Sequence, residues 1–130
     1  MRKMIVVSDK NCKQGKKPLE LLAKKVSDLL NIEEEISVVL VDGKYMKKIN
    51  GQYRDKNIAT DVLAFEDLDE IFICPQVVEK NAKENSITFN EELTRVFIHG
   101  IFHLKGYDHE LVDKEAEEMK RVENNLLKNL

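Results

Sequence analysis

The sequence predicts an α+β domain in which a mixed four-stranded sheet packs against about five helices. Short β-branched runs alternate with longer segments whose apolar residues recur every three or four positions. Two of the short runs, 61–66 and 69–74, are separated only by an acidic turn and predict an antiparallel hairpin, whereas the other connections are long enough for parallel crossovers. A chain of 130 residues, 42% of them hydrophobic, predicts a single domain over residues 1–130.

Individual residues mark the expected ends of several elements. The strands are expected at residues 3–7, 34–42, 61–66 and 69–74. Helices are expected at residues 18–32, 75–85, 88–104 and 112–128, and a short helix is expected within the segment 44–54. Pro18 suits a first helical turn, and Gly51 is expected to close the second helix. Thr88 and Glu91 form a capping box for the fourth helix, and Gly106 is expected to stop it.

Composition narrows the class of protein. No run of eighteen apolar residues exists and the N-terminus does not read as a signal peptide, so a cytoplasmic protein without a membrane partner is expected. Cys12 and Cys74 lack the spacing of a metal site and predict two reduced thiols, with Cys74 buried in a strand. The net charge of -3 neither requires nor excludes nucleic acid, which would need lysines gathered on one face. Two groups could form such a face: Lys10, Lys13, Lys16 and Lys17, and Lys44, Lys47, Lys48, Arg54 and Lys56.

All three histidines of the chain, His99, His103 and His109, lie in the segment HGIFHLKGYDH. The fourth predicted helix is apolar on two sides in its second half, which is typical of a central, buried helix. His99 and His103 lie one turn apart on one edge of it, and the turn after Gly106 could return His109 to the same point. The spacing predicts a metal site, with zinc as the first choice and a fourth coordination position open for catalysis.

Gly100 separates this segment from the zinc peptidases that it otherwise resembles. Three neutral ligands would leave zinc its full charge, so that it could activate a water or polarise a substrate oxygen. Peptidases with the HExxH pattern carry their general base directly after the first histidine. Glycine occupies that position here, which counts against proteolysis.

Two motifs resemble those of one known family. HGIFHLKGYDH resembles the HGxLHLxGYDH motif of the YbeY family, and INGQYRDKNIATDVLAFE at 49–66 resembles that family's LNxxYRxKDxPTDVLSFP segment. The resemblance extends over about residues 37–127 and includes the closing helix. The departures are Ala64, Glu66, Phe102 and an Asp69-Glu70-Ile71 segment without the family's glycine. They bear on packing and on the fine geometry of the substrate site.

The resemblance implies a metalloprotease-like layout with a central histidine-bearing helix and the activity of a single-strand-specific, metal-dependent endoribonuclease. It implies roles in maturation of the 3′ end of 16S, small-subunit ribosomal RNA and in ribosome quality control. His99, His103 and His109 would hold one zinc ion per chain, with Arg54 as a catalytic residue in the cleft beside it. The expected partners are single-stranded RNA, a ribosomal RNA precursor and the small ribosomal subunit with its proteins; no DNA partner is expected.

Several alternatives remain open at this point. The chain could be a zinc hydrolase acting on peptides or other esters, or a non-catalytic ribosome-assembly factor with a structural metal. The attacking oxygen could come from water or from the substrate's 2′-hydroxyl. Thr60 and Asp61 could orient the loop or only form a turn, and Tyr107 and Asp108 could support the third ligand or likewise form a turn.

Overall fold

The computed structural model describes residues 4–104 and 113–128, which form a four-stranded sheet, five α-helices and one short 3-10 helix. The strands are β1 (Ile5–Lys10), β2 (Ile36–Val41), β3 (Val62–Phe65) and β4 (Glu70–Ile73). The helices are α1 (Lys16–Leu30), α2 (Gly43–Arg54), the 3-10 helix η1 (Glu66–Leu68), α3 (Pro75–Glu84), α4 (Phe89–Leu104) and α5 (Asp113–Lys128). The predicted α+β class is confirmed. Across these ranges no helix has both the length and the apolar character needed to cross a membrane.

The sheet is mixed, in the order β1-β2-β4-β3. β1 and β4 pair in parallel with β2, whereas β3 pairs antiparallel with β4 and leaves its other side at the edge of the sheet. The predicted hairpin is therefore correct, with η1 as its turn. β1 reaches Lys10 rather than ending at residue 7, because Ser8, Asp9 and Lys10 continue the ladder with β2. β1 is the other edge strand of the sheet. Because side chains alternate between the two faces of a strand, polar residues of β1 can point away from the core.

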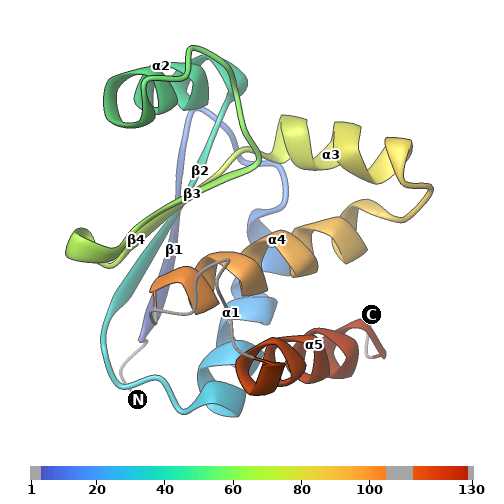
Figure 1. Ribbon diagram of the computed structural model, residues 1–130. Helices are drawn as coiled ribbons and strands as arrows, with labels where there is room; N and C mark the ends of the chain where they lie inside the picture. Colours follow the sequence, from blue (N-terminus) through green and yellow to red (C-terminus); the bar gives the residue numbers. More distant parts are fainter. Residues whose placement is uncertain (1–3, 105–112, 129–130) are drawn as a thin grey trace.

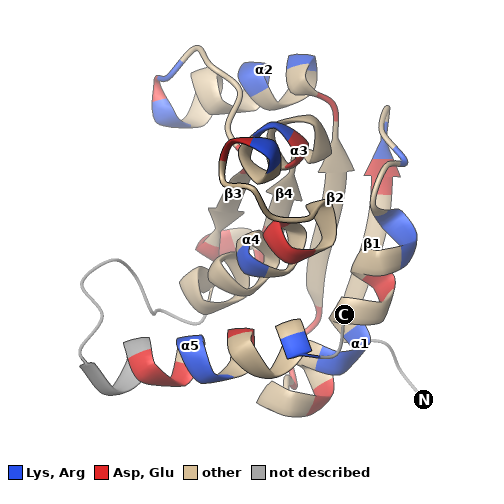
Figure 2. Ribbon diagram, turned by 90° about the vertical axis from the view of Figure 1, so that its right-hand side faces the viewer, with Lys and Arg blue, Asp and Glu red and all other residues tan. Residues whose placement is uncertain are grey.

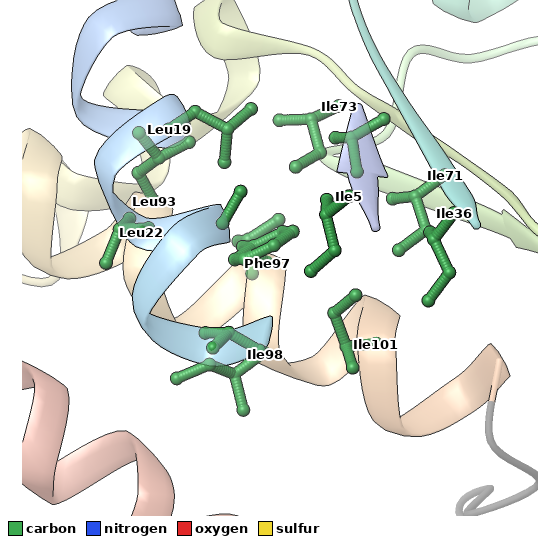
Figure 3. Packing of buried hydrophobic residues seen from close by; sticks show 14 of the residues in the cluster. Ile5, Leu19, Leu22, Ile36, Ile71, Ile73, Leu93, Phe97, Ile98 and Ile101 are labelled. Atoms are coloured by element: carbon green, nitrogen blue, oxygen red, sulfur yellow. The ribbon is translucent and has the colours of Figure 1, made fainter. Parts of the chain in front are cut away.

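One face of the sheet is covered by α1, α4 and α5, and it holds the larger core. Aliphatic side chains from the strands meet α1 and α4 there, as Figure 3 shows. Phe97, Ile98, Ile101 and Phe102 of α4 are all essentially inaccessible to solvent. Residues on both sides of α4 are thus buried, as the sequence predicts, and this helix is the centre of the domain.

In the described part of the chain, the other face of the sheet is covered by α2 alone, which lies away from α4 and α5 (Figure 1) and is joined to α3 by a hydrogen bond from the Gly43 N–H to Gln76 Oε1. A smaller cluster joins α2 to this face; its buried members are Val41, Met46, Ile49, Leu63 and Cys74. Cys74 is buried as expected, but it directly follows β4 and precedes α3 instead of lying within the strand. Burial raises the pKa of its thiol, which keeps it protonated.

The prediction that Gly51 closes the second helix is wrong. α2 continues to Arg54 and ends at Asp55, whose φ of 55° is left-handed and whose N–H donates to the Asn50 carbonyl. Aspartate adopts this conformation more readily than most residues, so it can end a helix where glycine is the usual choice. The extra turn matters because it carries Tyr53 and Arg54 out to the edge of the sheet.

The start of α4 agrees with the sequence. The Thr88 hydroxyl accepts a hydrogen bond from the Glu91 N–H (3.1 Å), and the Glu91 carboxylate accepts one from the Thr88 N–H (3.0 Å). This reciprocal pair satisfies two of the N–H groups that a helix start leaves without partners. The expected stop at Gly106 lies outside the described residues.

Candidate active site

A cleft of about 760 Å³ runs along the free edge of β3, between the end of α2 and the last turns of α4. Tyr53 and Arg54 reach it from α2, residues 62–68 form its floor and one end, and Gly100 and His103 come from α4. Residues from the two predicted motifs therefore meet in one cavity. The hairpin strand β3 brings them together, because α4 packs against its one face and α2 against its other.

Arg54 is held at the sheet edge by the strand itself. Its Nη2 donates a hydrogen bond to the carbonyl of Ala64 (3.1 Å), and its guanidinium carbon lies 5.9 Å from the centre of the Phe65 ring. The side chain is otherwise exposed. A guanidinium has five N–H donors, so this bond leaves most of them available to a ligand in the cleft.

A buried asparagine fixes the loop that joins Arg54 to β3. Asn50 is 3% exposed, and its Nδ2 donates to the carbonyl of Ile58 (3.0 Å). This bond ties the loop at 55–60 to α2, so the spacing between α2 and β3 is set. Thr60 and Asp61 contact each other at 3.4 Å between the hydroxyl and the carboxylate, and the Asp61 carbonyl accepts from the Cys74 N–H. The Asp61 carbonyl thus adds one hydrogen bond beyond the last residue pair of the β3–β4 ladder.

The two described histidines have different surroundings. His103 is exposed and lines the cleft with Arg54. The side chain of His99, one turn earlier, is 39% exposed and has its Nε2 at 3.6 Å from the carboxylate of Glu123 on α5. His109 lies outside the described residues, as do Tyr107 and Asp108. Within 4–104 and 113–128, no three His, Cys, Asp or Glu side chains are grouped so that they could hold a metal.

The chemistry of the two histidines nevertheless fits zinc. Imidazoles at positions i and i+4 of a helix can share one ion. A ligating histidine usually has a carboxylate at its second ring nitrogen, and Glu123 occupies that position beside His99. The other ring nitrogen of His99 remains for a metal. The spacing of His99 and His103 and the carboxylate near His99 thus fit the chemistry of a metal site, but of these two histidines only His103 lines the cleft.

A charged network that the sequence analysis missed continues from Glu123 along α4. Arg95 Nε lies 3.6 Å from Glu123 Oε1 and 3.7 Å from Glu92 Oε1. Glu92 is 3% exposed, and its Oε1 is buried without a hydrogen-bond partner. Desolvation raises the pKa of Glu92. A sequence signal did exist, because Glu92 precedes His99 by seven residues and so shares its face of the helix.

Gly100 lets α4 pack closely against the sheet, which its position in the motif does not predict. A Cβ on this residue would lie 3.3 Å from Ile71 side-chain atoms and 3.4 Å from a Val62 methyl carbon. α4 therefore approaches the sheet closely here. HExxH peptidases carry their general base at the position of Gly100. In this chain the same position is where the central helix contacts the hairpin.

Comparisons with known proteins agree with this geometry. The family model described as Endoribonuclease YbeY matches residues 4–130. A Thermotoga neapolitana protein named Endoribonuclease YbeY is 45% identical over 113 residues, which cover 82% of this chain and 76% of that protein. A protein of the same name from Bdellovibrio bacteriovorus is 40% identical over 110 residues, covering 81% and 73%. A solution structure of a Thermotoga maritima protein matches with a TM-score of 0.75 at 36% identity, over 97% of this chain and 91% of that one. The chain belongs to the YbeY endoribonuclease family.

Proposed function

We propose that this chain is a metal-dependent endoribonuclease that cuts single-stranded RNA, acting as one domain over residues 1–130. The observation that carries the proposal is that Arg54 and His103, which come from two separate motifs, line the same cleft. Family membership supports the nuclease activity.

Arg54 supplies the phosphate-binding half of the site. Cleavage of a phosphodiester builds negative charge on the nonbridging oxygens of the phosphate. A guanidinium matches these oxygens with two parallel N–H donors and keeps its charge at any physiological pH. The hydrogen bond to Ala64 orients the guanidinium before substrate arrives, so little side-chain entropy is lost on binding.

His99, His103 and His109 are the residues that would hold one zinc ion per chain. When bound, such an ion supplies a Lewis acid and lowers the pKa of a coordinated water. The Glu123 carboxylate, 3.6 Å from Nε2 of His99, would help to orient the ring of this histidine. Arg54 on the opposite wall of the cleft would hold the phosphate against this centre.

Two observations disfavour the peptidase alternative. Gly100 occupies the general-base position and packs too closely against Ile71 to admit a glutamate without displacing the core. Peptide substrates commonly add as a strand to an exposed sheet edge through its backbone groups. On β3 the guanidinium of Arg54 already occupies the carbonyl of Ala64.

The substrate that the family resemblance favours is the precursor of the small-subunit ribosomal RNA, processed at its 3′ end. On this proposal the protein works in the cytoplasm with the small ribosomal subunit and its proteins, and it contributes to ribosome quality control. A non-catalytic assembly factor would have the same location and partners. The test must therefore show whether the protein itself cleaves RNA.

The experiment incubates purified protein with a labelled single-stranded RNA carrying the precursor 3′ end, with the same RNA annealed to its complement, and with casein. Each is assayed with and without chelator. We expect cleavage of the single strand alone, its loss on chelation, and a fall of at least about 100-fold for Arg54→Ala and His103→Ala. Arg121→Ala, which removes an exposed arginine of α5 outside the cleft, is the matched control and should retain activity.

Cleavage that survives chelation and His103→Ala would refute the proposal. Complementation of a null strain by Arg54→Ala at the wild-type level, with no cleavage by either protein, would favour the assembly factor. End-group analysis of the products identifies the nucleophile: a 2′,3′-cyclic phosphate opposite a 5′-hydroxyl marks the 2′-hydroxyl, and a 5′-phosphate opposite a 3′-hydroxyl marks water.

A further inference from the structure

Four aromatic rings form a row across the face of the sheet that α2 only partly covers. Tyr45 lies 6.4 Å from Phe72 between ring centres, Phe72 lies 5.7 Å from Phe65, and Phe65 lies 5.4 Å from Tyr53. The row begins at α2 and ends at the free edge of β3, beside Arg54. The ring of Tyr53 has no large partner beyond Phe65 among these contacts, and the residue is 67% exposed.

A cavity of about 200 Å³ opens along this aromatic row (Tyr45, Phe72, Phe65 and Tyr53). It shares Tyr53, Phe65 and Leu68 with the cleft that contains Arg54 and His103. The two spaces therefore adjoin at these three side chains. Drug-sized ligands need about 300–1,000 Å³, so this cavity suits a single planar ring system attached to a chain that lies in the cleft.

The charged side chains around the aromatic row favour a ligand with a planar ring attached to an anionic chain. Lys48 lines the cavity, and Lys10 lies over the Tyr45 ring with its Nζ 4.6 Å from the centre. Lysines also project from the outer turns of α2, where Figure 2 shows blue segments. The acidic residues Glu66 and Asp67 line the opposite end of the cleft and repel a phosphate chain from the hairpin turn.

Polar groups beside the rings can recognise the edge of a base. Gln52 and Glu70 line the same cavity as the aromatic row. An amide offers both donors and acceptors, and a carboxylate accepts from exocyclic amino groups and ring N–H groups. Aromatic faces with a few polar groups at their rim are the usual means by which proteins hold unpaired bases.

We propose that this cavity is a nucleobase subsite: one unpaired base next to the scissile phosphate leaves the strand and stacks on the ring of Tyr53, whose plane lies at 71° to that of Phe65. The inference rests on the proposed function, because Arg54 must hold the phosphate for the neighbouring base to reach the row. A base in a duplex is stacked and paired on all sides and cannot enter. The subsite therefore makes single-strandedness a requirement of binding.

The test measures binding by fluorescence anisotropy with a labelled 2′-O-methyl oligouridylate of about ten nucleotides. Tyr53→Leu keeps an apolar side chain but removes the aromatic face, and we expect its Kd to rise about tenfold, since stacking contributes about 1–3 kcal/mol per base. Tyr53→Phe keeps the face and should bind like wild type. Leu21→Ala, which alters a 65% exposed leucine on α1, is the control for a change of exposed apolar surface.

Replacing single nucleotides by abasic ones locates the subsite on the ligand. We expect one abasic position to weaken wild type about tenfold and to have no further effect on Tyr53→Leu. Equal affinities for wild type and Tyr53→Leu, or an equal small effect at every abasic position, would overturn the subsite. Binding that still depends on Arg54 would then leave the proposed function standing, whereas wild type that neither binds nor cuts single-stranded RNA would overturn both. A competing peptide that displaces RNA from wild type but not from Tyr53→Leu would instead assign the row to a protein partner.

Discussion

The two faces of the sheet carry different kinds of side chain: one face is suited to stabilising the fold and the other to binding a ligand. The face under α1, α4 and α5 presents Val38, Leu40, Ile71 and Ile73, all closed to solvent. The face under α2 presents Phe65 and Phe72, which stay partly exposed. Branched aliphatic groups pack densely and stabilise the fold. Aromatic groups that keep one surface open can bind a ligand. The cleft lies along β3, whose alternate side chains join the larger cluster on one face and the smaller cluster on the other.

The comparison predicts that large substitutions on the two faces have very unequal effects on stability. Phe97→Ala on the covered face should lower the free energy of unfolding by about 3–5 kcal/mol, because it removes a fully buried ring. Tyr53→Ala on the open face should change it by no more than about 0.5 kcal/mol. Urea unfolding followed by circular dichroism measures both values. A large loss of stability for Tyr53→Ala would mean that the open face is also structural core.

Gly100 of α4 and Gly51 of α2 offer a matched pair on the two faces. Gly100→Ala places a methyl group against Ile71 and Val62, and we expect a net loss of about 1 kcal/mol after the gain in helix propensity. Gly51→Ala in α2 meets nothing closer than 3.7 Å, so it should gain about 0.5–1 kcal/mol. Thermal and urea unfolding of both variants give the signs. Two substitutions of the same sign would contradict the difference in packing between α4 and α2.

The buried charge on the covered side should have an effect on stability that depends on pH. The raised pKa of Glu92 means that the folded protein holds this proton more tightly than the unfolded chain. Stability should therefore fall as the pH rises from about 4.3, the ordinary glutamate pKa, through the folded value. Asp61 and Glu123 add to the cost of the charge, and Arg95 and His99 reduce it.

Glu92→Gln removes this cost and should stabilise the protein by about 1 kcal/mol at pH 7, with the difference vanishing near pH 4. Urea unfolding at the two pH values measures it, with Glu84→Gln on the exposed side of α3 as the control. A stabilisation that is the same at both pH values would show that charge burial is not its cause.

The sequence was most informative where local pattern and burial coincide. The apolar wheel of α4, the capping box at Thr88 and the hairpin around η1 follow from periodicity and turn chemistry, and all were predicted correctly. The end of α2 was predicted wrongly. A glycine is only a local signal, and the bond from Asn50 to Ile58 that stabilises the last turn joins residues across a loop.

The site was predictable in part. The spacing of His99 and His103 indicates that they share one edge of a helix. Arg54 was predicted as a catalytic residue only because of the family resemblance. The approach of Glu123 to His99 depends on how α5 crosses α4, which no local pattern encodes. The aromatic row was missed for the same reason, because its rings come from α2, β3 and β4 and become neighbours only when the sheet is assembled.

The unequal size of the two hydrophobic clusters has a consequence for how the cleft behaves over time. His103 is carried by the central helix of the larger cluster, whose amides should exchange with solvent only on global unfolding. Arg54 ends a helix that has three buried residues of its own and packs on a cluster of five. α2 should therefore detach in local opening events that leave α4 intact. Hydrogen exchange would show this as weaker protection of the α2 amides, which carry one wall of the cleft, than of the α4 amides, which carry the other.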